Sequence, residues 1–109
     1  MSAAGVHLYF PPFHLDLANE QLWRGKQPLP LRPKPFALLR YLVEHAGQLV
    51  TQEELRKAVW PKTYVSEGLL STYIRDLRTV LGDDPAAPRF IETVVRRGYR
   101  FIGTVASSQ

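Results

Sequence analysis

The sequence predicts an α+β fold in which a small antiparallel sheet comes first, helices follow, and a β-hairpin ends the domain. Three observations predict this order: short β-like segments interrupted by proline, then stretches with helical apolar spacing, then a β-rich segment that turns back at a glycine. The chain has 109 residues and is 45% hydrophobic, which suffices for one packed core. We therefore expect a single domain over residues 1–105, with 106–109 as a disordered tail or the start of a linker.

The N-terminal third contains the segments that resemble strands. Phe13 to Leu17 alternates apolar and polar residues, which is typical of a half-buried strand. Two prolines separate it from a short strand over residues 7–10. Residues 21–24 and 27–31 read as a hairpin, and the prolines of the second arm confine that arm to a sheet edge.

Two helices are predicted in the middle of the chain. Pro33 or Pro35 suits the first turn of a helix, where a missing N–H costs nothing, and Gly47 suits its end. The apolar stripe of this helix consists of Phe36, Leu39, Leu42, Val43 and Ala46. A second helix begins at Thr51, because Glu54 three residues later completes a capping box.

A third helix is predicted from about Ser66 to Leu81, with Gly82 as its stop. Its apolar stripe has spacings of 4, 3 and 4 and consists of Leu70, Ile74, Leu77 and Leu81. The opposite face carries Gly68, Thr72, Arg75, Asp76 and Thr79, with Ser71 and Arg78 at one border of the stripe. This polar face is not needed for the core, so it is the surface that we expect to meet a ligand.

The last segment predicts a hairpin with a basic tip. Phe90 to Val95 is rich in β-forming residues, the turn is Arg96-Arg97-Gly98, and residues 99–102 return. We expect Gly98 to supply a positive φ in this turn. Two helices joined by a short turn and followed by a basic-tipped hairpin are typical of winged helix-turn-helix folds that bind DNA.

Composition and charge narrow the classes of function. A formal net charge of +4 favours a polyanionic partner, although the basic residues are dispersed and form no basic tail. The chain has no cysteine, and its three histidines are scattered, so we expect no metal and no cofactor. We find no phosphate-binding glycine loop and no nucleophile–base pair, so we do not expect an enzyme. Without a membrane-spanning apolar run or a signal peptide, we expect no membrane contact by this segment and a cytoplasmic location.

From about Phe13 to Ile102 the chain resembles the OmpR/PhoB-type winged helix-turn-helix effector domain. Four segments carry the resemblance in order, namely residues 31–39, 50–60, 65–82 and 91–101. The resemblance implies an N-terminal four-stranded sheet, three helices and a C-terminal hairpin wing. It also implies that the third helix enters the major groove of double-stranded DNA while the wing approaches the adjacent minor groove. Binding to direct-repeat sites as a head-to-tail homodimer is a further implication.

The same resemblance assigns roles along the third helix. It places Ser71, Thr72 and Asp76 against bases, and Tyr73, Arg75 and Arg78 against phosphates. Serine and threonine hydroxyls can bond to base edges or contact a thymine methyl. Asp76 departs from the family pattern, since well-known members have a basic residue there. Its carboxylate either accepts a hydrogen bond from cytosine N4 or forms a salt bridge with a neighbour.

The wing and the packed aromatic residues supply the remaining candidates. Arg96 and Arg97 lie at the predicted wing tip, and a narrow minor groove attracts arginine through its negative potential. Val95 stands where some members have the inserting arginine, so which of the two arginines inserts stays open. Three residues fit either a phosphate contact or a structural role, namely Trp60, Thr93 and Tyr99.

Two further questions concern alternatives and partners. A winged helix used for protein–protein contact is the alternative function, and the arginines of the third helix and wing argue against it. A phosphorylatable receiver domain does not fit in 109 residues. The chain is therefore either the DNA-binding part of a larger regulator or a stand-alone one. Its resemblance to family members with N-terminal DNA-binding domains implies a sensor or other module on its C-terminal side.

Overall fold

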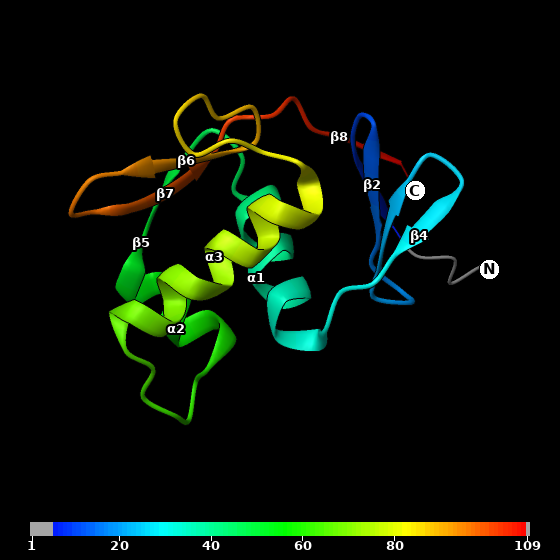
Figure 1. The fold of residues 1–109 in the computed structure, drawn as a ribbon. Helices are drawn as coiled ribbons and strands as arrows, with labels where there is room; N and C mark the ends of the chain where they lie inside the picture. The colour runs from blue at the N-terminus through cyan, green and yellow to red at the C-terminus, as the bar shows by residue number, and fades with distance from the viewer. Residues whose placement is uncertain (1–5, 109) are drawn as a thin grey trace.

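The computed structural model describes residues 6–108 and has the predicted α+β architecture, with two antiparallel sheets and three helices (Figure 1). Along the chain the elements are β1 (His7–Phe10), β2 (Phe13–Asp16), β3 (Gln21–Arg24), β4 (Gln27–Leu29), α1 (Pro33–Glu44), β5 (Leu49–Thr51), α2 (Gln52–Val59), α3 (Glu67–Leu81), β6 (Ile91–Val94), β7 (Gly98–Phe101) and β8 (Ala106–Ser108). The predicted order of sheet, helices and hairpin is confirmed.

The N-terminal sheet has five strands, in the order β4-β3-β2-β1-β8. The fifth strand comes from the C-terminal end of the chain, where Ala106 pairs with Tyr9 and Ser108 pairs with His7. The prediction of a disordered tail is therefore wrong for residues 106–108, and residue 109 lies outside the described part of the chain. The expected four-stranded sheet forms and is extended by one strand.

The wing belongs to a second sheet of three strands, in the order β5-β7-β6. In the pairing of β5 with β7, Thr51 lies opposite Gly98. The prediction that Gly98 has a positive φ is wrong, because the left-handed residue of the turn is Arg96, with φ of +67°. Glycine is needed at position 98 for a different reason: a Cβ there would collide with the Val50 carbonyl oxygen and lie 2.8 Å from the Thr51 Cα. The close passage of β5 sets this requirement.

Local hydrogen bonds fix the ends of the two helices that matter for the site. The predicted capping box of α2 is present, with the Glu54 N–H donating to Thr51 Oγ1 at 3.0 Å and the Thr51 N–H donating to Glu54 Oε1 at 3.4 Å. Ser66 caps α3 by accepting from the Leu69 N–H at 3.1 Å. Gly82 ends α3 in the left-handed conformation, with φ of +67°.

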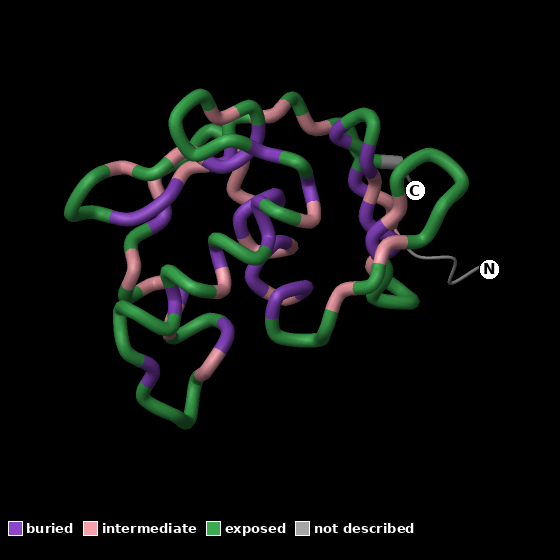
Figure 2. Tube along the Cα trace, in the orientation of Figure 1, coloured by how far each residue is buried: buried purple, intermediate pink, exposed green. Residues whose placement is uncertain are grey.

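The core joins the two sheets through the helices. The predicted apolar stripe of α3 is buried, and Figure 2 shows buried segments along the inner sides of the helices, while the wing tip is exposed. Phe10 from the N-terminal sheet and Phe101 from the wing sheet meet edge to face, with ring centroids 5.1 Å apart. Phe90 also packs against Phe10, at 5.8 Å. These rings hold the wing sheet and the N-terminal sheet in one packed unit.

Candidate nucleic-acid interface

The outer face of α3 is exposed to solvent. The exposed residues of this face are Gly68, Ser71, Thr72, Arg75, Asp76 and Thr79. The opposite face is buried and contains the predicted stripe of Leu70, Ile74, Leu77 and Leu81. The helix is therefore anchored by one side and presents small and polar side chains on the other, as the sequence predicts.

Two threonines on this face have their hydroxyl hydrogens directed at the helix backbone. Thr72 Oγ1 donates to the Gly68 carbonyl at 3.0 Å, and Thr79 Oγ1 donates to the Arg75 carbonyl at 3.1 Å. Each hydroxyl oxygen keeps its lone pairs, and each side chain keeps its methyl group. Both threonines thus offer a ligand an acceptor and an apolar surface.

Asp76 is exposed and takes part in none of the ion pairs between residues 6–108. Those pairs join Arg40 with Glu44, Lys57 with Glu53, and Arg100 with Glu92. The alternative that Asp76 forms a salt bridge with a neighbouring residue of the chain therefore gains no support. Its carboxylate is available to a donor from outside the chain.

The wing projects from the helices (Figure 1). Two arginines at its tip, Arg96 and Arg97, are exposed. Val95, Arg96 and Arg97 connect β6 to β7, and the Val95 side chain is 74% exposed. The Arg97 N–H donates to the Val94 carbonyl at 2.9 Å and closes the turn. The Arg97 carbonyl in turn accepts from the Gln52 N–H at 3.2 Å, which ties the turn to the start of α2.

A hollow of about 400 Å³ lies between the N-terminal half of α3 and the wing. Its lining residues are Gln52, Glu67, Gly68, Ser71, Thr93, Val95, Arg96 and Tyr99. Four of the predicted site residues are brought together here, namely Ser71, Thr93, Arg96 and Tyr99. Sequence reasoning did not single out Gln52 and Glu67, because their place beside the wing depends on the pairing of β5 with β7.

Arg78, which is predicted to contact phosphate, makes its hydrogen bonds within the domain. Only 8% of Arg78 is exposed, and its guanidinium crosses to the wing. Nη2 donates to the Ile91 carbonyl at 2.9 Å and to Thr93 Oγ1 at 2.7 Å. Two residues predicted to contact phosphates are therefore bonded to each other. Arg78 lies at the border of the apolar stripe, and acceptors on the wing draw its side chain inward.

The remaining aromatic candidates are part of the packed structure. Tyr99 is 5% exposed, yet it also lines the hollow beside the wing. Trp60 and Tyr73 are half-buried, with ring centroids 5.3 Å apart. Tyr73 lines a further depression with Arg32 and Lys34 at the start of α1. Core packing and access to a ligand thus coexist at these positions.

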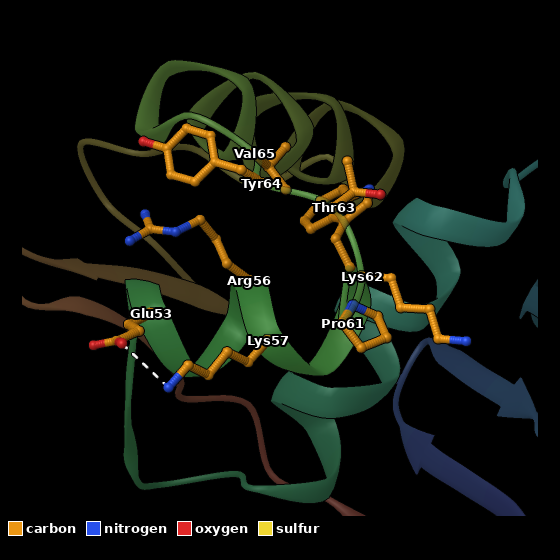
Figure 3. Close-up of a pocket in the computed structure, with 9 residues that line it drawn as sticks. Glu53, Arg56, Lys57, Pro61, Lys62, Thr63, Tyr64 and Val65 are labelled. Atoms are coloured by element: carbon orange, nitrogen blue, oxygen red, sulfur yellow. Dashed lines mark ion pairs between the residues drawn. The ribbon is translucent and has the colours of Figure 1, made fainter.

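A second hollow, of about 410 Å³, lies between α2 and the loop that leads to α3 (Figure 3). Its lining residues are Glu53, Arg56, Lys57, Trp60, Pro61, Lys62, Thr63, Tyr64 and Val65. Figure 3 shows Lys57 directed at Glu53, with Nζ 3.2 Å from Oε2, whereas Lys62 points away from the hollow. Tyr64 is 83% exposed. Sequence reasoning did not single out Tyr64.

Comparison with known proteins places the chain in a family. The family described as "Transcriptional regulatory protein, C terminal" matches residues 26–101 of this chain. The chain belongs to this family. It is 37% identical over 94 residues to the KDP operon transcriptional regulatory protein KdpE of Escherichia coli, covering 85% of this chain and 42% of KdpE. This chain thus spans less than half the length of that relative.

Solved structures of the family have the same fold. The RstA DNA-binding domain of Klebsiella pneumoniae in complex with the RstA box has a TM-score of 0.80 and 30% identity, covering 88% of this chain and 96% of that one. The response regulator DrrB of Thermotoga maritima, an OmpR/PhoB homolog, has a TM-score of 0.80 and 34% identity, covering 88% of this chain and 44% of DrrB. The OmpR/PhoB-type resemblance and the winged helix-turn-helix fold are confirmed.

The family is one of transcription regulators and not of enzymes. Within residues 6–108, no group of three or more His, Cys, Asp and Glu side chains is placed to hold a metal ion. No helix in that part of the chain is long and apolar enough to cross a bilayer.

Proposed function

We propose that this chain binds double-stranded DNA with sequence preference on behalf of a transcription regulator. In this proposal α3 enters the major groove and the wing approaches the neighbouring minor groove. The observation that carries it is the exposed polar face of α3, which is bordered by the half-exposed Leu69 and lies beside a wing tipped by two exposed arginines. A helix about 10–12 Å across fits the major groove, which is about 12 Å wide. The likeness to the RstA DNA-binding domain, which was solved in complex with the RstA box, supports DNA binding.

We assign base contacts to Ser71, Thr72 and Asp76. The Thr72 hydroxyl hydrogen is directed at the Gly68 carbonyl, so Thr72 would accept from a base amine or contact a thymine methyl. Asp76 is a carboxylate outside the ion pairs of the described residues and would accept from cytosine N4. Thr72 and Asp76 thus offer acceptors and a methyl group, so they favour bases that present amines or a methyl in the major groove.

We assign phosphate contacts to Arg75 on α3 and minor-groove contacts to Arg96 and Arg97. Four residues with structural roles would add phosphate contacts at their exposed edges, namely Trp60, Tyr73, Thr93 and Tyr99. Phosphate contacts fix the position of the protein on the duplex, whereas base contacts carry the sequence preference. Arg78 is left out of this set because its guanidinium is bonded to the wing.

The larger assembly is also part of the proposal. Because this chain spans 42% of KdpE, we infer that the domain works beside another module in a longer regulator. Binding as a head-to-tail homodimer on direct repeats, placement of the other module on the C-terminal side, absence of catalysis and a cytoplasmic location remain predictions from the sequence and the family. A gel-shift titration on duplexes with one and two copies of a selected site would test the dimer.

The decisive experiment selects duplexes from a random pool and measures binding to the enriched sequence by fluorescence anisotropy. We expect one enriched motif and a steep fall in affinity with salt, because phosphate contacts release counterions. Absence of binding to any duplex at low salt would overturn the proposal and favour a module for protein–protein contact. If affinity falls with salt but the selection enriches no motif, the proposed sequence preference alone would be overturned.

A further inference from the structure

Two charged side chains from the end of α3 hold the first residue of the wing. The Ile91 N–H donates to Asp83 Oδ2 at 2.9 Å. The Ile91 carbonyl accepts from Arg78, at 2.9 Å from Nη2 and 3.3 Å from Nε. Both backbone groups of one wing residue are therefore bonded to side chains anchored at one helix end.

Asp83 also organises the chain that leads into β6. Its carboxylate accepts from the Arg89 N–H at 2.7 Å and the Phe90 N–H at 3.2 Å, in addition to the Ile91 N–H. Asp83 is 9% exposed and Arg78 is 8% exposed. Hydrogen bonds to an ionised group are about twice as strong as neutral ones, and burial limits competition from water. The root of the wing is thus held more firmly than ordinary strand pairing would hold it.

The end of α3 fixes the two charged residues relative to each other. The Asp83 N–H donates to the Arg78 carbonyl at 2.8 Å, and the Gly82 N–H donates to the Thr79 carbonyl at 3.2 Å. With Gly82 left-handed, this is a Schellman motif, which leaves the chain one well-defined exit from the helix. The positions of Arg78 and Asp83 are therefore set by the helix itself before the wing is reached.

We propose that Arg78 and Asp83 form a clamp that sets the angle between α3 and the wing, an inference that rests on the proposed function. Arg96 lies five residues beyond Ile91, which is roughly 16 Å at about 3.3 Å per residue. A tilt of about 10° at the clamp would move the wing tip by roughly 3 Å, enough to break a hydrogen bond. The clamp residues are positioning residues: they let α3 and the wing engage both grooves at once without contacting DNA themselves.

A double-mutant cycle tests the clamp. The wing variant Arg96→Ala/Arg97→Ala is combined with Arg78→Met, which keeps the apolar stem of Arg78 and removes its donors. In the unaltered background we expect the wing variant to lose affinity by roughly tenfold or more. In the Arg78→Met background we expect the wing variant to lose no more than about threefold, because an unclamped wing no longer contributes fully.

The matched control replaces Arg75 with Met on the exposed face of the same helix. Because Arg75 would contact phosphate directly, its loss and the loss of the wing arginines should multiply. If the affinity losses from Arg78→Met and from the wing variant also multiply, and Arg78→Met lowers the slope of log affinity against log salt concentration by about one, Arg78 binds phosphate. That result would overturn the clamp. If the midpoint of thermal unfolding falls while the cost of the wing variant stays the same, Arg78 is only structural and the clamp is again overturned.

Footprinting supplies an independent readout. With Arg78→Met we expect loss of minor-groove protection from hydroxyl radicals, while protection of guanine N7 in the major groove persists. Parallel weakening of both footprints would contradict the clamp. If Arg78→Met unfolds at the assay temperature, Asp83→Asn gives the same comparison, since it removes part of the same hydrogen-bond set. Failure of the unaltered chain to bind any duplex would overturn the proposed function and the clamp together, whereas multiplicative losses would overturn the clamp alone.

Discussion

The surface formed by α3 and the wing differs from the outer face of the N-terminal sheet in what its side chains contact. On the first surface Asp76, Arg96 and Arg97 are exposed and belong to none of the ion pairs among residues 6–108. On the outer face of the sheet, Tyr9 and His14 lie opposite each other with ring centroids 5.2 Å apart. His14 lies opposite Trp23 in the same way, with rings 6.0 Å apart and nearly parallel.

This difference indicates a division of labour within one small domain. The rings of the sheet face contact one another across strands, which stabilises the sheet and leaves few groups for a ligand. Asp76, Arg96 and Arg97 have no ion-pair partner within the described residues, so their charges are available to a partner. Exposure alone does not distinguish the two surfaces, whereas the presence of internal partners does.

The largest effect is expected where the two regions meet. Phe101 is fully buried and packs against Phe10 of the N-terminal sheet. Phe101→Ala should lower the free energy of unfolding by about 3–5 kcal/mol, measured by urea denaturation. Its neighbour Ile102 is 41% exposed, and Ile102→Ala serves as the control with an expected change within about 0.5 kcal/mol. Equal losses for the two variants would show that the aromatic contact does not join the regions.

The next effect separates the wing from general positive charge. Arg96→Ala/Arg97→Ala should weaken binding to every duplex by roughly tenfold or more, with little change in the free energy of unfolding. The control is Lys26→Ala, in the exposed turn between β3 and β4 of the N-terminal sheet. Titrations at several salt concentrations should show a lower slope for the wing variant only. A similar loss for Lys26→Ala would mean that net charge and not the wing drives affinity.

A smaller effect should appear in base preference. Thr72→Ala and Asp76→Ala should each change discrimination at particular base pairs by about 1–3 kcal/mol. Repeating the duplex selection with each variant measures this change. Arg75→Ala provides the contrast, since loss of a phosphate contact should weaken binding without altering the selected motif. An unchanged motif for both Thr72→Ala and Asp76→Ala would disprove the assigned base-contacting face.

The smallest effect is expected on the sheet face and depends on pH. Burial lowers the pKa of His14 below its usual 6.5, and the neighbouring His7 lowers it further, while Asp16 opposes the shift. The unfolded chain therefore binds a proton more readily, so stability should fall as the pH is lowered through 6.5 towards the folded-state pKa. Urea midpoints at pH 7.5 and 5.5 should differ less for His14→Asn than for the unaltered chain. A pH response that is the same in both proteins would contradict this assignment.

The helices and the exposed face of α3 could be predicted because local signals determine them. The capping box of Thr51 and Glu54, the glycine stop at Gly82 and the apolar stripe of α3 each depend on neighbours within one or two turns. The stripe also fixes which side of α3 is exposed. The exposed face follows from periodicity alone, whereas its proposed contacts with bases are implied by the family resemblance.

Other features depend on partners far away in the sequence and could not be predicted. The strands β5 and β8 have three residues each, too few for an alternating pattern, and their pairing with β7 and β1 is long-range. Arg78 lies at the border of its helix stripe, so the acceptor at Ile91 decides that it turns inward. The need for glycine at position 98 arises from the passage of β5, which no local pattern reveals.

The pairing of β8 with β1 determines where neighbouring parts of a longer protein can attach. His7 and Ser108 lie side by side at the sheet, at the end of the molecule away from the wing (Figure 1). A module joined before β1 or after β8 would therefore emerge from the same region. With α3 and the wing on the duplex, such a module would extend outward from the DNA, and both attachment points would leave the DNA-facing surface unobstructed.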